Sequence, residues 1–423
     1  MDTEKYRASA VVVQSALLFA QSLVVSNIGS QDVAEICAKV DQFILEELKH
    51  MYKNVQEKGI AAPTEICKQD FISGISPEMV DEFRGGIIQE NDLVKISVGV
   101  HVDGYTVIGA HTLVIREGVP ENPFQGNDAD SYIAAFLANE AVISLLSVSV
   151  TEDHPLAALG PVTGSRIKEV VESLAQAFDC HIVPGSRVRK VSRFVIGQSK
   201  VEEKKGQYIE WHEEGCNVTE FTVFPDSVWI VDISMASNLG NQDSRIRQTE
   251  FNGYTSRRES PTVYSRDYTK TYALKNPSSR KLLQKIDTLS VYPFKLSYLA
   301  TTDKELQMLR LGLIECIQRR LLYPHPRLQA RISTITDKTG KLVNTSREAS
   351  TIALVSAKKT ESGFPEVIRL SGGKQFPPSW VHSVKEVPSG VAAELLNARM
   401  AKLPGFKYIE IKGRTPEESM EIN

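Results

Sequence analysis

The stretch that most constrains the fold is 93–115, LVKISVGVHVDGYTVIGAHTLVI, which predicts a β-hairpin. Two runs rich in β-branched residues, 93–102 and 105–115, flank the dipeptide Asp103-Gly104. An Asp-Gly pair supplies the positive φ angles that a tight two-residue hairpin turn requires. We therefore expect two antiparallel neighbours joined by this turn, and we take them as the centre of the fold.

The expected turn also fixes which residues face each other across the hairpin. Ser97 pairs with Ala110 and Gly99 pairs with Ile108, so Ser97 and Ile108 become diagonal neighbours on one face, about 7 to 8 Å apart. Side chains at that separation can share a ligand, and two carboxylates there would form half of a two-metal site. This chain has a hydroxyl group and a hydrocarbon at the two positions.

Composition and charge describe an ordinary soluble intracellular protein. The chain has 423 residues, of which 42% are hydrophobic and 24% charged, and its net charge of -3 predicts no overall attraction to nucleic acid. Any such attraction must come from local patches. Five scattered cysteines without a CxxC pair suggest neither a disulfide framework nor a zinc knuckle, and they fit a reducing compartment.

The hydrophobic periodicity predicts alternating helices and strands, which points to an α/β or α+β architecture. Segment 8–26 carries no charge and is almost long enough to span a membrane, but its glutamines and serines favour a buried first helix. We expect the remaining helices at 31–53, 130–148, 164–178, 277–288, 303–322 and 391–402. We expect strands within 181–232 and 333–355, and irregular connections at 59–77 and 237–258.

Three further motifs accompany the hairpin: Ala62-Pro63-Thr64, Ser76-Pro77 and the segment 228–237. Together these features resemble the pita-bread fold of type II methionine aminopeptidases. They are more similar to that fold's non-peptidase relatives, the proliferation-associated (ErbB-receptor-binding) proteins and the fungal pre-ribosomal large-subunit nuclear export factor. The resemblance implies a pita-bread domain over 1–355 with a basic insert at about 238–330, followed by a C-terminal extension over 356–423.

In the peptidases of this fold, two divalent metals hold the attacking water between hard ligands. The resemblance places the family's five ligand positions on Ser97, Ile108, Arg189, Asp232 and Ala349. Only Asp232 keeps a carboxylate. We therefore expect a degenerate metallopeptidase with no catalytic residue, no metal and no cofactor.

Nearby side chains do not repair this ligand set. Glu348 is one residue out of register with Ala349, so on a strand it points to the opposite face. The family's substrate-contacting histidine falls on Gly74. His101 and His111 are expected on opposite faces of the hairpin, and no P-loop, GxGxxG or GxSxG motif offers another chemistry.

Two stretches concentrate positive charge, and tyrosines at 254, 264, 268 and 272 interleave with the second. Arginine can fork onto phosphates and tyrosine offers a stacking face, so these stretches predict an RNA-contacting surface. The alternative is a solvated face balanced by nearby acids such as Glu213 and Glu214. The candidate residues are Arg187, Arg189, Lys190, Arg193, Arg257, Arg258, Arg266, Lys270, Lys275, Arg280 and Lys281.

Further sequence similarities distinguish the peptidases, their general non-peptidase relatives and the export factor. Segments 261–268 and 272–275 resemble those relatives and not the peptidases. Segments 59–64 and 96–99 are most similar to the export factor, with serine where the general relatives usually keep an aspartate. The chain ends acidic, without the long basic tail of the receptor-binding relatives.

The resemblance implies a non-catalytic ribosome-biogenesis factor. Such a protein binds late (pre-60S) precursors of the large subunit, through rRNA and ribosomal proteins near the polypeptide tunnel exit, and assists their nuclear export. We expect a monomer that shuttles between nucleus and cytoplasm, contacts nucleoporins and a small helper protein, and does not bind membranes. The alternatives are an active metallo-aminopeptidase and a general RNA- or DNA-binding protein of the proliferation-associated type.

Overall fold

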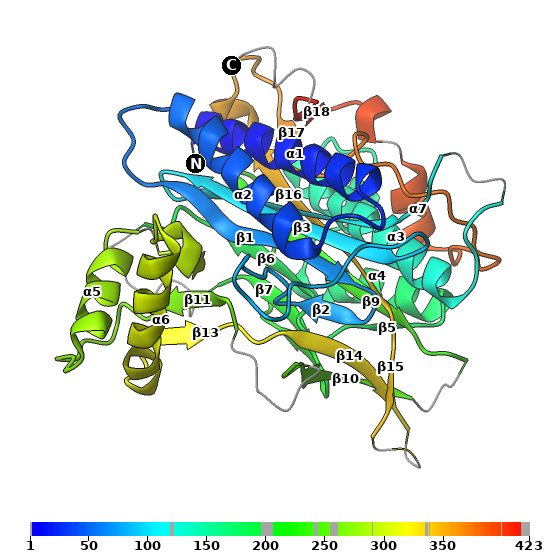
Figure 1. Cartoon of the computed structure of the whole chain (residues 1–423). Coiled ribbons are helices and arrows are strands. Elements are labelled where there is room, and N and C mark those ends of the chain that lie inside the picture. Colours follow the sequence, from blue (N-terminus) through cyan, green and yellow to red (C-terminus); the bar gives the residue numbers. More distant parts are fainter. Residues whose placement is uncertain are drawn as a thin grey trace.

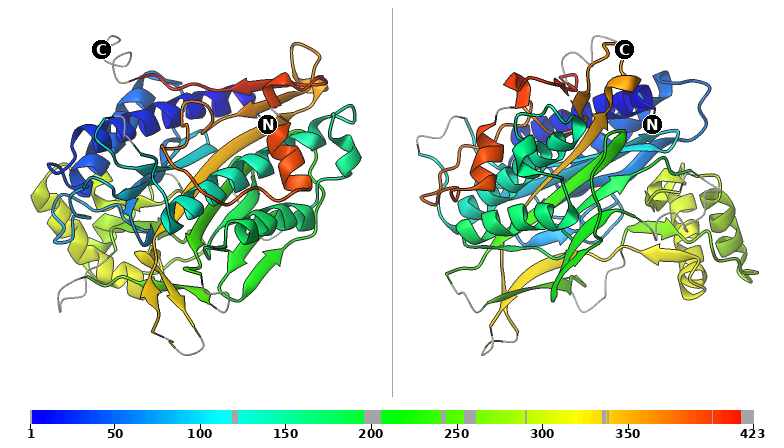
Figure 2. Two further views of the ribbon diagram at one scale, coloured as in Figure 1. Left: turned by 90° about the vertical axis from the view of Figure 1, so that its right-hand side faces the viewer. Right: turned by 180° about the vertical axis from the view of Figure 1, so that it is seen from behind.

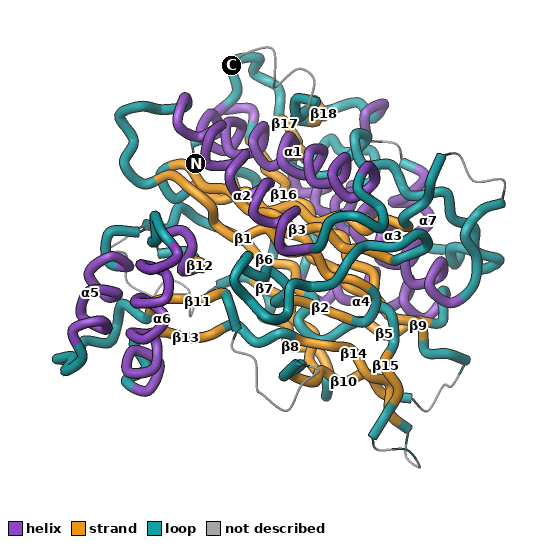
Figure 3. Tube along the Cα trace, viewed as in Figure 1, coloured by secondary structure: helices purple, strands orange, loops and turns teal. Residues whose placement is uncertain are grey.

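The computed structural model describes residues 2–118, 122–195, 206–240, 244–253, 261–289, 291–334, 337, 339–398 and 400–415. A large mixed sheet runs through the molecule, and long helices cover one of its faces (Figure 1). Figure 3 distinguishes this helical layer from the strands, and a smaller helix-containing unit lies at one end of the sheet. The main sheet therefore divides the molecule into a helix-covered side and an opposite side.

In the described part of the chain, the main sheet has eleven strands, eight of which form the path β1-β3-β4-β16-β9-β6-β7-β8. Strands β5, β17 and β18 pair outside this path. The strands on the path are β1 (Lys58–Lys68), β3 (Leu93–Val102), β4 (Tyr105–Val114), β16 (Thr345–Val355), β9 (Ser227–Ser237), β6 (Arg187–Val191), β7 (Tyr208–His212) and β8 (Gly215–Val218).

The hairpin prediction is confirmed. Strands β3 and β4 pair antiparallel around Asp103 and Gly104, whose φ angles are 53° and 76°. The register also matches, because Ser97 pairs with Ala110 and Gly99 with Ile108. Asp and Gly tolerate these positive φ angles, which is why an Asp-Gly dipeptide predicts this turn.

Two expected irregular connections contain strands. Segment 59–77 holds β1 and the short β2 (Phe71–Ser73), and segment 237–258 holds β10 (Arg245–Glu250). Register shifts interrupt the pairing of β1 with β3 between Ile60 and Glu65, and Pro63 lies between them. A proline and a bulge are tolerated on an edge strand, but they erase the alternation that predicts one.

Four helices in the described residues cover one face of the main sheet: α1 (Thr3–Ser26), α2 (Val33–His50), α3 (Asn127–Ser147) and α4 (Gly164–Ala177). Asp2, Asp32 and Thr163 cap three of them by accepting a backbone N–H. A Cβ on Gly109 of β4 would lie 2.8 Å from the Leu17 side chain, so α1 packs directly on the hairpin. Figure 2 shows α1 in blue and α3 in teal on the same side of the sheet.

Helix α1 and the segment Asn127–Val150 are long and apolar enough to cross a membrane by length and composition. Within the structure, 56% and 72% of the apolar 18-residue windows of these two segments are buried. Their apolar residues pack against β3, β4, β9 and β16. The predicted buried first helix is confirmed, and α3 is a second long, apolar core helix.

A smaller sheet packs on the face opposite the helices. It consists of β10, β14 (Leu328–Ser333), β15 (Lys341–Leu342) and β2. Ile246 of β10 and Ile332 of β14 share a small hydrophobic cluster with Ala236 of β9. The smaller sheet therefore covers part of the open face of the main sheet at one end.

The unit at the end of the sheet, which we call the insert, comprises α5 (Pro277–Ile286), α6 (Asp303–Gln318), β11 (Val263–Arg266), β12 (Phe294–Lys295) and β13 (Leu322–Pro324). It has its own hydrophobic cluster, centred on Leu282, Leu309 and Leu321. A buried ion pair of 2.6 Å between Lys295 Nζ and Asp41 of α2 anchors it to the helical layer.

The C-terminal extension adds to the main sheet. Strand β17 (Glu366–Arg369) pairs with β16, and β18 (Lys407–Glu410) pairs with β17 in parallel. The other strand outside the main path, β5 (Cys180–Ile182), precedes the extension in the chain and pairs with β9. Helix α7 (Val391–Asn397), within the predicted helical segment 391–402, contributes Leu395 to the core under α3 and α4. Arg414 N donates to Ser15 Oγ, so the extension contacts α1 at this residue.

Candidate functional site: the open face of the sheet

Directly paired residues of neighbouring strands point to the same face of a sheet. One transverse row on the face opposite the helices crosses six strands, and it consists of Glu65, Ser97, Ala110, Ala349, Asp232 and Arg187. Three of the five positions that the resemblance assigned to metal ligands lie in this row. The other two, Ile108 and Arg189, lie two residues further along β4 and β6, on the same face.

The structure therefore brings the predicted ligand positions together, as the family's geometry requires. Ser97 and Ala349 are buried, with 4% and 1% of their surface exposed, and Ile108 is half-buried. Ile108 and Ala349 have no donor atom in their side chains, and a neutral serine hydroxyl is a weak ligand for a divalent ion. Asp232 is the only acidic side chain of the five.

The carboxylate of Asp232 is already engaged by an arginine. Arg347 Nε and Nη2 donate to the two Asp232 oxygens over 2.8 and 2.9 Å, and Arg347 Nη1 lies 3.5 Å from Glu65. Burial would raise the pKa of Asp232, but the charge and hydrogen bonds of Arg347, followed by the charges of Arg187 and Arg189, lower it. Asp232 is thus held ionised by a guanidinium group.

Sequence reasoning did not identify Arg347, because it belongs to no family ligand position. It lies two residues before Ala349 on the same strand, and this spacing of two along a predicted strand was the signal that could have found it. The guanidinium group is on the sheet face opposite the helices, which we call the cleft face, and its side chain is 17% exposed.

Arg187, and not Arg189, pairs with Asp232, while Arg189 pairs with Ile230. Three arginines therefore lie near Asp232, the one carboxylate kept among the five ligand positions. Two divalent cations need several hard anionic or imidazole ligands, and this donor set offers Asp232 and Glu65 already compensated by cations. The residues present do not fit a two-metal centre.

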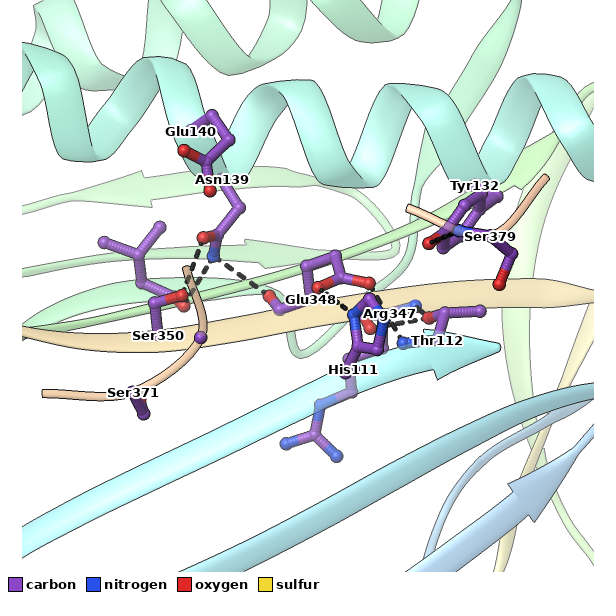
Figure 4. Close-up of polar contacts among 12 residues, drawn as sticks. His111, Thr112, Tyr132, Asn139, Glu140, Arg347, Glu348, Ser350, Ser371 and Ser379 are labelled. Atoms are coloured by element: carbon purple, nitrogen blue, oxygen red, sulfur yellow. Dashed lines mark hydrogen bonds and ion pairs between the residues drawn. The ribbon is translucent and has the colours of Figure 1, made fainter. Parts of the chain in front are cut away.

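Glu348 points away from this row, as its register predicted. Its Oε2 lies 3.0 Å from His111 Nδ1, and its Oε1 accepts the backbone N–H of Thr112 over 2.9 Å (Figure 4). Glu348 and His111 are buried on the helix-covered side, near Tyr132 of α3. Glu348 therefore stabilises the helical side of the sheet and cannot replace the ligand lost at Ala349.

The contact between β4 and β16 is unusual, because Ala349 and Ala110 are the only residues that pair there among those described. Side chains supply the other links between these two strands, and we call this boundary the seam. Thr351 Oγ1 donates to Ile108 O over 2.8 Å and accepts Ile108 N–H over 3.0 Å. Thr112 Oγ1 likewise donates to Arg347 O over 2.7 Å and accepts Arg347 N–H over 2.8 Å.

The seam continues toward α3 and the C-terminal extension. Ser371 Oγ donates to Ile108 O over 2.7 Å and accepts Thr351 N–H over 2.8 Å. Asn139 Nδ2 donates to Val231 O and Glu348 O on the helix side (Figure 4). The hydroxyl groups of Thr112, Thr351 and Ser371 therefore replace a backbone ladder between β4 and β16, where the two halves of the ligand set meet.

His101 lies on the cleft face of β3, opposite Thr106, whereas His111 faces the helices, so the expected separation of the two histidines is confirmed. The His101 ring is fully buried and lies 4.3 Å from the Tyr292 ring, centroid to centroid. Neither ring nitrogen has a hydrogen-bond partner among the described residues. Burial lowers the pKa of His101 to about 4, so the ring is neutral at physiological pH.

The first basic stretch divides between the two faces and the hairpin turn. Arg187 and Arg189 are half-buried on the cleft face, and Lys190 is exposed on the other side of the strand. Arg193 donates to Asp103 O over 2.9 Å and forms a 2.5 Å ion pair with the Asp103 carboxylate. Arg193 therefore helps to fix the hairpin turn.

The second basic stretch requires a correction at Arg266. We expected an exposed cation, but Arg266 is buried, with 9% exposure. Its Nη1 donates to Asp267 O, Lys270 O and Leu321 O, and its Nε donates to Asp287 over 3.2 Å. These bonds close the insert's loops around a guanidinium group, so Arg266 is an internal residue and not a surface contact.

The exposed members of that stretch are Lys270, Lys275, Arg280 and Lys281. Tyr264 is buried with 3% exposure, whereas Tyr272 is 42% exposed and lies under the Arg319 guanidinium at 4.3 Å from the ring centroid. Sequence reasoning missed Arg319, because it follows the predicted tyrosines by a whole helix. Arg257, Arg258 and Tyr254 lie outside the described residues.

Comparisons with known proteins identify relatives of this chain in sequence and in fold. A scan against protein-family models finds no match for the chain. The chain is 35% identical to the probable metalloprotease ARX1 of Yarrowia lipolytica, over 96% of this chain and 91% of that protein. It is 30% identical to the probable metalloprotease ARX1 of Saccharomyces cerevisiae, over 90% of this chain and 87% of that protein.

Among solved structures, that of a thermophilic Arx1 superposes with a TM-score of 0.71, at 22% identity and over 93% of this chain and 96% of the other. The structural match bears on the fold, and the sequence identity over nearly the whole length bears on the family. The predicted pita-bread fold and the predicted likeness to the fungal factor are both confirmed. The chain belongs to the Arx1 family of proteins with the methionine-aminopeptidase-like pita-bread fold.

Proposed function

We propose that this protein is a non-catalytic ribosome-biogenesis factor that binds late precursors of the large ribosomal subunit near the tunnel exit and assists their nuclear export. The observation that carries the proposal is the ion pair at the positions where the peptidases hold their metals. Arg347 occupies the carboxylate of Asp232 where a peptidase would hold its metals. A chain that keeps the peptidase fold without this chemistry is suited to a role as a scaffold.

The exposed surface of the insert supports an RNA partner. Lys270, Lys275, Arg280 and Lys281 are exposed there, and Tyr272 stacks with Arg319. Such side chains bind phosphates and stack on unpaired bases. Because the whole chain carries a net charge of -3, this attraction is local and gives a directed contact in place of general affinity for polyanions.

Attachment of the insert to the main body supports the same role. Lys295 and Asp41 form an ion pair with side chains 3% and 5% exposed, and Tyr298 OH donates to Asp41 over 2.8 Å. A second pair joins Arg310 of α6 to Glu78 over 3.0 Å. These contacts hold the basic insert in a fixed position relative to the cleft, as a scaffold for a large assembly requires.

The experiment is co-sedimentation of the purified protein with large-subunit precursors at physiological salt. We expect stoichiometric association, and we expect the double variant Lys270→Glu/Arg280→Glu to weaken it about tenfold or more and to reduce its salt dependence, because each cation contacts phosphate. The matched control Lys39→Glu/Lys49→Glu makes the same change in charge at exposed positions of α2.

Three outcomes decide between the candidate functions. Failure of the parent protein to co-sediment contradicts the ribosomal proposal. Equal binding to unrelated RNA and DNA favours a general nucleic-acid-binding protein. Release of N-terminal methionine from a test peptide with stoichiometric metal favours an active peptidase, the activity that the names of the fungal relatives suggest.

The proposal extends to partners and location. We propose a monomer that shuttles between nucleus and cytoplasm and contacts nucleoporins and a small helper protein, without binding membranes. Fluorescence microscopy of the tagged protein after blocking nuclear export checks the location, and accumulation in the nucleus is the expected result. Continued exclusion from the nucleus under this block contradicts shuttling.

A further inference from the structure

A cavity of about 410 Å³ lies where the C-terminal extension meets helix α1, away from the row of former ligand positions. Gln14 of α1 forms one wall of this cavity. Tyr408, Glu410 and Lys412, at alternate positions along β18 and the residues after it, form another, and Lys374 comes from the turn after β17. Figure 2 shows the end of the extension in red beside α1 in blue.

Hydrogen bonds fix the walls of the cavity. Gln14 Nε2 donates to Gly372 O over 2.8 Å and to Ile411 O over 2.9 Å, while Gln14 Oε1 accepts the Gly372 N–H. Gln375 Nε2 and Oε1 bind the carbonyl and the N–H of Gly413 in the same two-point manner. A Cβ on Gly413 would lie 2.4 Å from backbone atoms of α1, so glycine permits this close approach. The cavity is therefore preformed, which lowers the cost of ordering on binding.

The charged groups that line the cavity are two lysines and one glutamate. Both oxygens of the Glu410 carboxylate are engaged, Oε1 by the Tyr408 hydroxyl over 3.0 Å and Oε2 by the Lys374 backbone N–H over 3.4 Å. The Lys374 and Lys412 side chains are exposed, and neither ammonium group forms a hydrogen bond or an ion pair with any residue that the structure describes. Two cations are thus free to meet a ligand.

Two arginines near the cavity are already paired. Arg369 of β17 binds both oxygens of Glu140 over 2.9 and 2.5 Å. Arg414, at the end of the described extension, lies 3.3 Å from Glu47 of α2. The acidic chain end 416–423 lies outside the described residues. Within the described part of the chain, the uncompensated charge at the cavity is therefore that of the two lysines.

We propose that this cavity binds a small phosphate monoester, with Lys374 and Lys412 on the phosphate group. A phosphate monoester carries roughly two negative charges at pH 7, so it matches two ammonium groups better than a single carboxylate does. Lysine binds phosphate as a point charge with rotatable donors. Ala401, Ile411 and the Tyr408 ring line the rest of the cavity and contact the organic part of the ester. This inference does not depend on the ribosomal proposal.

The test is a calorimetric titration of the intact protein at low ionic strength with AMP, with glycerol 3-phosphate and with inorganic phosphate. The first two probes distinguish a nucleotide from a smaller ester. We expect one saturable site per chain for at least one ester, with a dissociation constant of roughly millimolar size. Inorganic phosphate should bind about threefold more weakly or worse, because it has no organic part to bury.

The double variant Lys374→Gln/Lys412→Gln should weaken binding of the ester about tenfold or more, because it removes both charge-assisted contacts to phosphate. The matched control Lys304→Gln/Lys341→Gln makes the same change in charge at exposed positions of α6 and β15, and it should change the affinity by less than about twofold. Ala401→Trp, which fills space beside the apolar wall, should weaken the ester and spare inorganic phosphate.

Three results overturn the proposal. The first is the absence of saturable binding of either ester. The second is equal weakening by the two double variants, which would place the anion elsewhere on the protein. The third is equal affinity for the esters and inorganic phosphate, which would show that the apolar wall contacts no part of the ligand.

Discussion

Arg347 of β16 and Asp232 of β9 form a two-point ion pair, in which guanidinium nitrogens Nε and Nη2 lie 2.8 and 2.9 Å from the two carboxylate oxygens. The pair bridges neighbouring strands in the row where the resemblance places metal ligands. A fixed cation there neutralises the remaining acid without any exchangeable ion. The charge of Asp232 is thus compensated by a side chain of the same protein.

Arg347→Met tests how much the fold depends on this pair. Removing one partner of a buried ion pair leaves an uncompensated charge, so the free energy of unfolding should fall by about 3 to 5 kcal/mol. Urea denaturation measures the change. Arg280→Met, at an exposed position of α5, should change stability by less than about 0.5 kcal/mol. Equal effects of the two variants would show that the pair is not a stabilising element.

Acid should also weaken this pair. The pKa of Asp232 is lowered in the folded protein, so its contribution to stability is fully present above the unfolded pKa near 4 and is lost as the pH falls through the lower folded value. Asp232→Asn should therefore flatten the loss of unfolding free energy below about pH 4 relative to the parent protein. Parallel curves for parent and variant would contradict this assignment.

Thr351→Val tests the seam. Thr351 Oγ1 is the partner of Ile108 N–H and one of two donors to Ile108 O. The nearly isosteric change leaves a half-buried N–H without its partner, so stability should fall by about 1 to 3 kcal/mol. Thr271→Val, on the exposed surface, is the control. A neutral Thr351 variant would mean that water or a shifted strand satisfies the backbone.

The hairpin, the core helices and the separation of the two histidines could be predicted from local rules. Asp103 and Gly104 specify the turn, and alternation fixes the faces. Strand β1 escaped prediction because Pro63 and the register shifts hide its alternation, and its strand character comes from pairing with β3. Tertiary pairing overrides local pattern at such an edge.

His101→Phe tests the buried ring beside Tyr292. The pKa of His101 is about 4 in the folded protein, below its ordinary value of 6.5, because burial disfavours the charged form. The parent should therefore keep full stability above about pH 6.5 and lose about 3 kcal/mol from this group as the pH falls to 4. Phenylalanine cannot titrate, so the variant should lose less over this range in urea denaturation at several pH values.

His154 serves as the internal check, because burial also lowers its pKa to about 4 and it remains in both proteins. The difference between parent and His101→Phe therefore isolates His101. If the difference between their unfolding free energies is constant from pH 7 to pH 4, His101 is not held neutral by burial.

Lys295→Met tests the anchor of the insert. The Lys295 ammonium group is buried. Burial lowers the pKa of Lys295, but the neighbouring acidic groups, Asp41 foremost, together more than offset this effect, so the net pKa is raised and the pair is ionised. Breaking it should lower stability by about 3 to 5 kcal/mol. Limited proteolysis should show faster cleavage within the insert. Lys281→Met, exposed on α5, should leave the cleavage rate unchanged.

The candidate site could be predicted only in part. The five ligand positions could be located from the resemblance, and the strand pairing places three of them in one row and the other two beside it on the same face. Arg347 and Arg319 were missed, because each acquires its role from a partner far away in the sequence, Asp232 and Tyr272 respectively. Arg266 was misplaced for the same reason, since local composition does not reveal that carbonyl groups at Asp267 and Leu321 enclose it.

Calorimetric titration of the intact protein with Mn²⁺, in parallel with Asp232→Asn, tests most directly whether the metal centre has been lost. We expect no saturable binding that depends on Asp232, because Arg347 occupies that carboxylate. Binding of one or two Mn²⁺ ions per chain with micromolar affinity, lost in Asp232→Asn, would contradict it and would restore the cleft as a metal centre.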